Sequence, residues 1–162
     1  MSGVSSSPLK DLGHVLPGFQ EGTTSVGSSV GVQRWLTVPL GIPTLADGAT
    51  YNNTIFIAPC NGCVIKELWL TGVVKVASGT NTLAIDNYDV SAAAARNVQS
   101  ATNIDPDTVT AKTGLKLTLS TTAANLRMDE GDVLNTTLIL GTQSTAGQGY
   151  SLTACIVVPE IV

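Results

Sequence analysis

Short runs of apolar and β-branched residues alternate with clusters of turn-forming residues from position 32 onward. The runs recur roughly every eight to twelve residues, a spacing typical of β-sandwiches and barrels. Several runs are partly alternating, as expected of a sheet with one face in water. The pattern predicts eight strands, at about 32–38, 53–59, 63–70, 72–77, 81–86, 115–120, 133–140 and 150–158.

The segments between these runs carry residues that favour turns. Asn61-Gly62 is a strong two-residue hairpin signal. The best helix candidate is residues 91–96, where Ser91 is placed to cap four alanines of high helix propensity. Residues 97–113 have no strong period and are predicted to be a loop. We therefore expect an all-β fold, a single antiparallel β-sandwich with one short helix in a connection.

The N-terminal region differs from the rest of the chain. Residues 1–30 hold seven of the 13 serines and five of the 16 glycines, and such a stretch does not order itself alone. Apolar residues nevertheless recur every three or four positions, the spacing of one helical face. Two interpretations stay open, a frayed terminus or an arm whose apolar side chains order only against a neighbour. In the second, the partner-binding residues are Leu9, Leu12, Leu16 and Phe19.

Two regions follow from this contrast. We expect a flexible N-terminal arm at residues 1–31 and a β-sandwich domain at residues 32–162. At 162 residues the chain is long enough for one domain with a conventional core and too short for two.

Composition and charge exclude several classes of partner. Charged residues make up 12% of the chain, about half the usual share, and Ser and Thr together number 34. The eight bases are scattered singly, so no basic stripe exists for nucleic acid to bind. No apolar run approaches the roughly 20 residues that span a bilayer, and the start lacks the features of a secretory signal. We expect synthesis in the cytoplasm, and neither nucleic acid nor a membrane as partner.

Candidate catalytic chemistry is sparse. The only histidine, His14, lies in the arm, where it is poorly placed to act as a general base. Acidic residues gather around 86–89, 105–107 and 129–132. Turns explain these clusters more simply than a calcium site or a glycosidase pair does. The aromatic residues Trp35, Phe56 and Trp69 lie in strand-like runs and are expected in the core. We expect no enzyme activity, no catalytic residues, no metal and no cofactor.

Cys60-Asn-Gly-Cys63 leaves three interpretations open. The two cysteines could be small buried or edge residues without chemistry, a disulfide formed late, or part of a metal site. A zinc site needs four ligands, and only Cys155 and His14 remain to complete it. Thiols stay reduced in the cytosol.

Five runs between about 50 and 159 combine strand residues with the turns between them: Thr54-Ile-Phe-Ile-Ala-Pro59, Gly62-Cys-Val-Ile-Lys-Glu-Leu-Trp-Leu70, Leu115-Lys-Leu-Thr-Leu-Ser120, Glu130-Gly-Asp-Val-Leu134 and Leu152-Thr-Ala-Cys-Ile-Val-Val-Pro159. In this strand-and-turn pattern the chain resembles the head decoration, or cement, proteins of tailed bacteriophages. The resemblance implies that the sandwich is jelly-roll-like. It also implies a homotrimer on the outer capsid surface that binds the major capsid protein and locks neighbouring subunits together. Jelly rolls also serve as glycan- or receptor-binding modules, such as tail-fibre or spike domains, and this alternative remains open.

Overall fold

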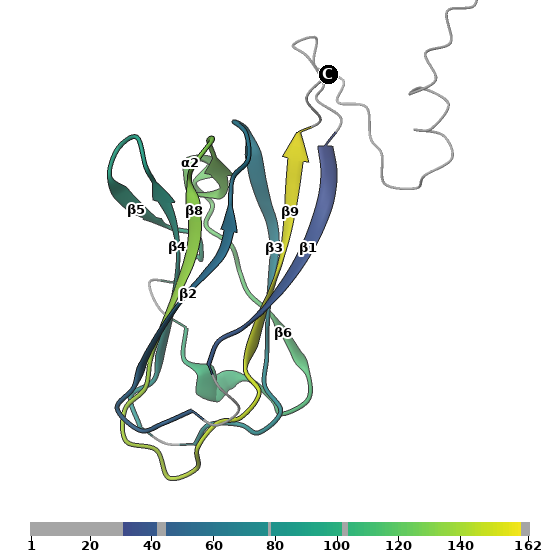
Figure 1. Ribbon diagram of the computed structural model, residues 1–162. Coiled ribbons are helices and arrows are strands. Elements are labelled where there is room, and N and C mark those ends of the chain that lie inside the picture. Colours follow the sequence, from purple (N-terminus) through teal and green to yellow (C-terminus); the bar gives the residue numbers. More distant parts are fainter. Residues whose placement is uncertain (1–30, 42–44, 78, 102–103, 160–162) are drawn as a thin grey trace, which may run out of the picture.

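The computed structural model describes residues 31–41, 45–77, 79–101 and 104–159. They form two antiparallel sheets that face each other, which confirms the predicted all-β sandwich (Figure 1). One sheet has the order β1 (Gly31–Pro39), β9 (Ser151–Pro159), β3 (Cys63–Thr71) and β6 (Gly114–Lys116), and β7 (Arg127–Met128) also pairs with β3. The other has the order β2 (Thr50–Ile57), β8 (Val133–Ile139), β4 (Thr82–Asp89) and β5 (Ala94–Asn97). Leaving β7 aside, this is the strand order of a jelly roll.

The core lies between the sheets and is mostly aliphatic. Along β8, Leu134, Thr136 and Leu138 are buried while the residues between them are partly or fully exposed, because successive side chains of a strand point to opposite faces. Leucines and isoleucines of the two sheets meet in this layer, including Ile65, Leu68, Leu70, Leu83, Ile85, Leu134, Leu138, Leu152 and Ile156.

The helix predicted at 91–96 is wrong. Ala94–Asn97 is strand β5, paired with β4 in an antiparallel hairpin. The Asp89 carboxylate accepts hydrogen bonds from Ser91 Oγ at 2.7 Å and from the Ala92 amide at 2.9 Å. These bonds fold the backbone into a turn, and pairing with β4 then outweighs the helix propensity of the alanines. The α-helix in the described part of the chain is instead α2 (Ala123–Leu126), between β6 and β7.

Two further expectations about local structure are also wrong. Residues 72–77 form no strand, and they make only single bridges, Val74 with Gln148 and Ala77 with Thr145. Asn61-Gly62 does not close a hairpin, because β2 and β3 lie in different sheets. Gly62 has a φ of 84° but Asn61 has no positive φ, so the turn is not the type I′ turn of a hairpin, and it leads from one sheet to the other.

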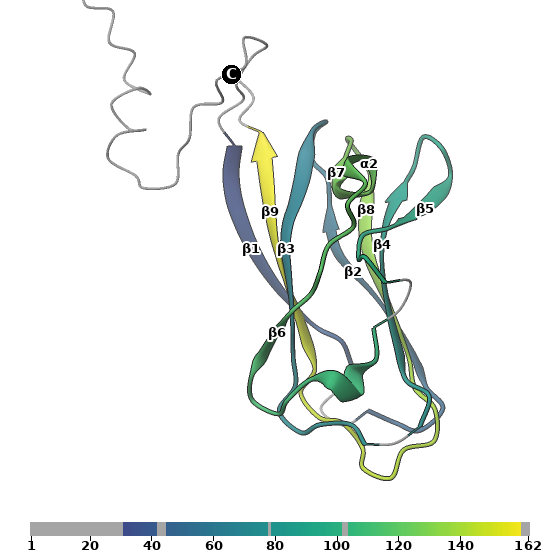
Figure 2. The ribbon, with the colours of Figure 1, turned by 180° about the vertical axis from the view of Figure 1, so that it is seen from behind.

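The predicted loop at 97–113 is largely irregular, with a short 3-10 helix η1 (Pro106–Thr108) inside it. At one edge of the five-stranded sheet, β1 runs beside β9, and Gly31 pairs with Pro159 (Figure 2). The described part of the chain therefore begins with an edge strand.

Candidate docking surface

The site residues predicted from the sequence, Leu9, Leu12, Leu16 and Phe19, lie outside the described residues, as does His14. What the sandwich itself offers to a partner has to be found on its faces and edges.

Both tryptophans lie on the outer face of the five-stranded sheet. Trp35 is in the edge strand β1, opposite Cys155 of β9, and is 55% exposed. Trp69 is in β3, opposite Thr153 of β9 and Lys116 of β6, and is partly buried. The surface formed by Trp35, Trp69 and the outward-facing side chains of β1, β9 and β3 beside them is called here the tryptophan face.

The expectation that Trp35 and Trp69 belong to the core is therefore wrong. Along β1, Leu36 and Val38 pack against the core, and the alternation of a strand places Trp35 on the opposite side. Phe56, by contrast, packs against the core while staying partly exposed.

Trp69 is held in place by a small charged group. Its indole Nε1 donates to Glu67 Oε2 at 2.9 Å, and Lys116 Nζ lies 3.0 Å from Glu67 Oε1. Lys116 Nζ also lies 5.4 Å from the centre of the Trp69 ring. The hydrogen bond from Trp69, followed by that from Lys116, lowers the pKa of Glu67. Such an exposed ion pair adds little stability, but it fixes the indole and cancels the charge of the two side chains.

Hydroxyl groups fill the rest of the tryptophan face. Thr37 and Thr153 hydroxyl oxygens are 2.9 Å apart, and those of Thr71 and Ser151 are 2.7 Å apart. Cys155 also lies on this face, yet it is only 2% exposed. Burial raises the pKa of its thiol. The face thus carries hydroxyls beside indole rings, with the exposed Lys66 next to the Glu67–Lys116 pair.

The tryptophan face ends at an edge that can accept another strand. β1 is nine residues long and, among the described strands, pairs on one side only, with β9. Its one charged residue is Arg34, and its one proline, Pro39, is its last residue. A long edge strand with a single charge and no internal proline can pair with another chain.

The acidic cluster at 129–132 is a turn, as the sequence predicts, whereas the turn expected at 86–89 is wrong because both acids lie in β4. Asp132 is 3% exposed, and its carboxylate accepts from the Val90 amide at 3.0 Å and the Asp129 amide at 2.8 Å. Within the described ranges, no group of three or more His, Cys, Asp or Glu side chains could hold a metal ion. The buried carboxylate therefore supports two loops.

Asp89 ties the β4–β5 turn and makes stability depend on pH. Hydrogen bonds from Ser91 and the Ala92 amide, with the Arg96 guanidinium beside it, lower the pKa of Asp89. A lowered pKa means that the ionised form stabilises the fold above about pH 4 and that this contribution is lost as the pH falls through the folded-state value. Asp89→Asn is therefore expected to be less stable than the parent at pH 7, with the difference shrinking toward pH 2.5. Thermal midpoints across this range measure it. A difference that stays constant with pH would contradict this role of Asp89.

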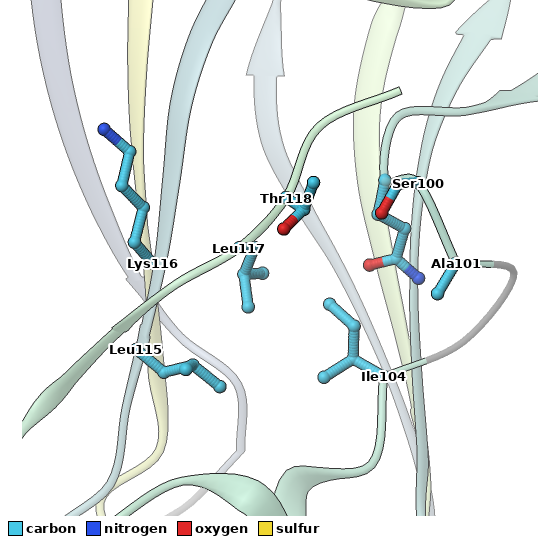
Figure 3. Close-up of a pocket in the computed structure, with 8 residues that line it drawn as sticks. Ser100, Ala101, Ile104, Leu115, Lys116, Leu117 and Thr118 are labelled. Atoms are coloured by element: carbon cyan, nitrogen blue, oxygen red, sulfur yellow. The ribbon is translucent and has the colours of Figure 1, made fainter. Parts of the chain in front are cut away.

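A small pocket opens between the sheets, beside β6 (Figure 3). Its volume is about 220 Å³, and Ile104, Leu115 and Leu117 point into it while Lys116 points away. No acid, histidine or cysteine is among the described residues that line it. The pocket has the chemistry of a gap in the apolar layer.

In the described residues, no helix has the length and apolar character needed to cross a membrane.

No protein-family model matches the chain, and no curated protein matches its sequence. Among solved structures, a chain of the cyanophage Pam1 capsid asymmetric unit is similar, with 12% identity and a TM-score of 0.48 over 89% of this chain and 100% of that one. A chain of the infectious bursal disease virus Gx strain is similar with 12% identity and a TM-score of 0.39, over 79% of this chain and 32% of that one. Likeness at this level assigns no role to the chain.

Proposed function

We propose that this protein is a structural virion protein that binds the outer capsid surface and stabilises the head by bridging major capsid subunits. It is made in the host cytoplasm and acts as a homotrimer on the particle. The observation that carries the proposal is the tryptophan face, with Trp35 55% exposed at the free edge of the sheet.

Exposing an indole is costly unless a partner covers it. Tryptophan is enriched among the few residues that dominate binding energy at protein interfaces, and charged residues are depleted at the centres of interfaces. The tryptophan face meets the first condition with Trp35 and Trp69. Its ion pair, Glu67 with Lys116, is internally neutralised, and Lys66 is left as its exposed charge. Such a face fits a protein surface better than a small substrate.

Bridging requires contacts in more than one direction. The tryptophan face points out of the plane of the sheet. The free edge of β1 instead points sideways, within that plane, and offers backbone groups for strand addition. The arm at 1–31 joins the sandwich at this edge, so it can add a third contact through Leu9, Leu12, Leu16 and Phe19. Face, edge and arm together suit a protein that joins neighbouring subunits.

A second function, glycan or receptor binding, is favoured by one observation on the other sheet. A shallow hollow of about 310 Å³ is lined only by amide and hydroxyl side chains, Asn52, Asn53, Asn135, Thr136 and Thr137. Asn53 and Thr136 face the layer between the sheets, whereas Asn52, Asn135 and Thr137 present amide and hydroxyl groups on the outer face. Sugar hydroxyls pair with such groups, so a glycan array is the experiment that separates this function from capsid binding.

Trp35→Ala tests the proposed function. Capsids assembled without this protein are mixed with the parent or the variant, and the bound fraction is measured by sedimentation. Loss of a central interface tryptophan is expected to weaken attachment about thirtyfold, corresponding to ~2 kcal/mol. Ile139→Ala is the matched control, because Ile139 is 47% exposed on the outer face of the other sheet. Equal attachment of the parent and Trp35→Ala would contradict docking through the tryptophan face.

A further inference from the structure

Cys60 and Cys63 stand at the two ends of the turn that leads from β2 to β3. Both are free thiols, and their Sγ atoms are 4.0 Å apart. The Cys63 thiol donates to the Cys60 carbonyl oxygen at 3.3 Å. A disulfide needs about 2.05 Å between sulfurs, so rotation of the two side chains about their Cα–Cβ bonds can close the gap without moving the turn far.

The turn between the two cysteines is fixed to a neighbouring segment. The Gly62 amide donates to the Met128 carbonyl at 3.0 Å, and the Glu130 amide donates to Asn61 Oδ1 at 2.7 Å. Gly62 has a φ of 84°, a left-handed conformation that glycine adopts without strain. The short separation of the thiols is therefore set by the fold.

The two thiols differ in access and acidity. Cys60 is partly exposed, whereas Cys63 is buried in the core. Burial, together with the hydrogen bond and charge of neighbouring Cys60, raises the pKa of Cys63 to about 11. Because the thiolate is the attacking species, the exposed thiol is the one that a reagent in solution meets first.

We propose that Cys60 and Cys63 form a dithiol site that a small-molecule disulfide, such as oxidised glutathione, converts into an intramolecular disulfide. The Cys60 thiolate attacks one sulfur of the reagent, the S–S bond of the reagent breaks, and one thiol leaves with a proton. Cys63 then gives up its proton and attacks Cys60 Sγ in the mixed disulfide, which releases the second thiol. The protein loses two electrons and two protons, and the reagent is reduced to two thiols.

The position of this bond gives it a structural meaning. The cysteines lie at the crossing from the four-stranded sheet, through β2, to the five-stranded sheet, through β3. Closing the ring there fixes the link between the sheets after the protein leaves a reducing compartment. The site is independent of the tryptophan face and of the proposed capsid role.

The test treats the reduced, folded, full-length protein with oxidised glutathione, blocks free thiols with an alkylating agent after unfolding, and measures intact mass and peptide masses. The expected product lacks two hydrogens, contains a Cys60–Cys63 link and carries one alkyl group, on Cys155. A product with all three cysteines alkylated, or with glutathione still attached to Cys60, would overturn the proposal.

Three variants separate the steps. Cys155→Ser is expected to form the same link as the parent, whereas Cys63→Ser is expected to stop at a glutathione adduct on Cys60. Because Cys63 is fully buried, its replacement can disturb the fold as well as remove the thiol. Cys60→Ser, at a partly exposed position, therefore provides an independent test. Its remaining thiols are expected to stay free in the folded protein. Rapid glutathione attachment to Cys63 in Cys60→Ser would show that Cys60 is not the entry point and would overturn the proposed order.

Discussion

Leu138→Ala is expected to lower the free energy of unfolding by about 2–5 kcal/mol, the usual cost of truncating a buried leucine. Leu138 is fully buried in β8, the strand that pairs with both β2 and β4. Its side chain lies in the layer between the sheets, so the variant loses apolar contacts and leaves a cavity. In a domain of this size the thermal midpoint falls by about 2–4 °C for each kcal/mol. Chemical and thermal denaturation measure the effect.

The next residue along the same strand is the control. Ile139 is 47% exposed on the outer face, so Ile139→Ala removes a similar side chain without opening a cavity and is expected to change stability by less than ~1 kcal/mol. Equal losses for the two variants would mean that β8 does not present alternate residues to the core.

The strands were predictable because their two faces meet different surroundings. The run 133–140 is rich in apolar and β-branched residues, and β8 buries every second one of them, Leu134, Thr136 and Leu138. Signals that depend on a partner far along the chain were misread. The alanines at 92–95 favour a helix locally, but the hydrogen bonds of Asp89 and pairing with β4 decide their structure. Residues 72–77 look like a strand, yet their neighbours offer only single bridges.

The tryptophan face was missed because tryptophan was treated as a core residue. A signal for it exists in the sequence. Trp35 shares its side of the strand with Gln33 and Thr37, while Leu36 and Val38 share the other. Trp69 likewise shares its side of the strand with Glu67 and Thr71, while Leu68 and Leu70 share the other. Parity along each run therefore indicates exposure, whereas the contact of Lys116 with Trp69 and Glu67 depends on pairing of β6 with β3 and could not be read from spacing.

Deletion of residues 1–30 is expected to leave the sandwich folded and to weaken attachment to capsids, or association between sister subunits, by about a hundredfold or more. Each apolar side chain buried against a partner contributes about 1.5–3 kcal/mol, less the cost of ordering the segment. Two or three of Leu9, Leu12, Leu16 and Phe19 therefore suffice for this loss. The deletion ends where β1 begins at Gly31, so the pairing of β1 with β9 is retained. Circular dichroism checks the fold, and sedimentation with and without capsids measures both kinds of association.

Point variants decide whether the apolar side chains or the mere length of the arm matter. Leu12→Ser with Leu16→Ser keeps the length and removes two apolar side chains, whereas Ser5→Ala with Ser6→Ala changes neighbouring polar positions and serves as the control. The first pair is expected to reproduce most of the loss and the second pair none of it, because burial of apolar area supplies the binding energy. If the truncated protein binds capsids and forms oligomers as well as the full chain does, the arm is a frayed terminus. Attachment then depends on the tryptophan face and the edge of β1, where Trp35→Ala retains its full effect.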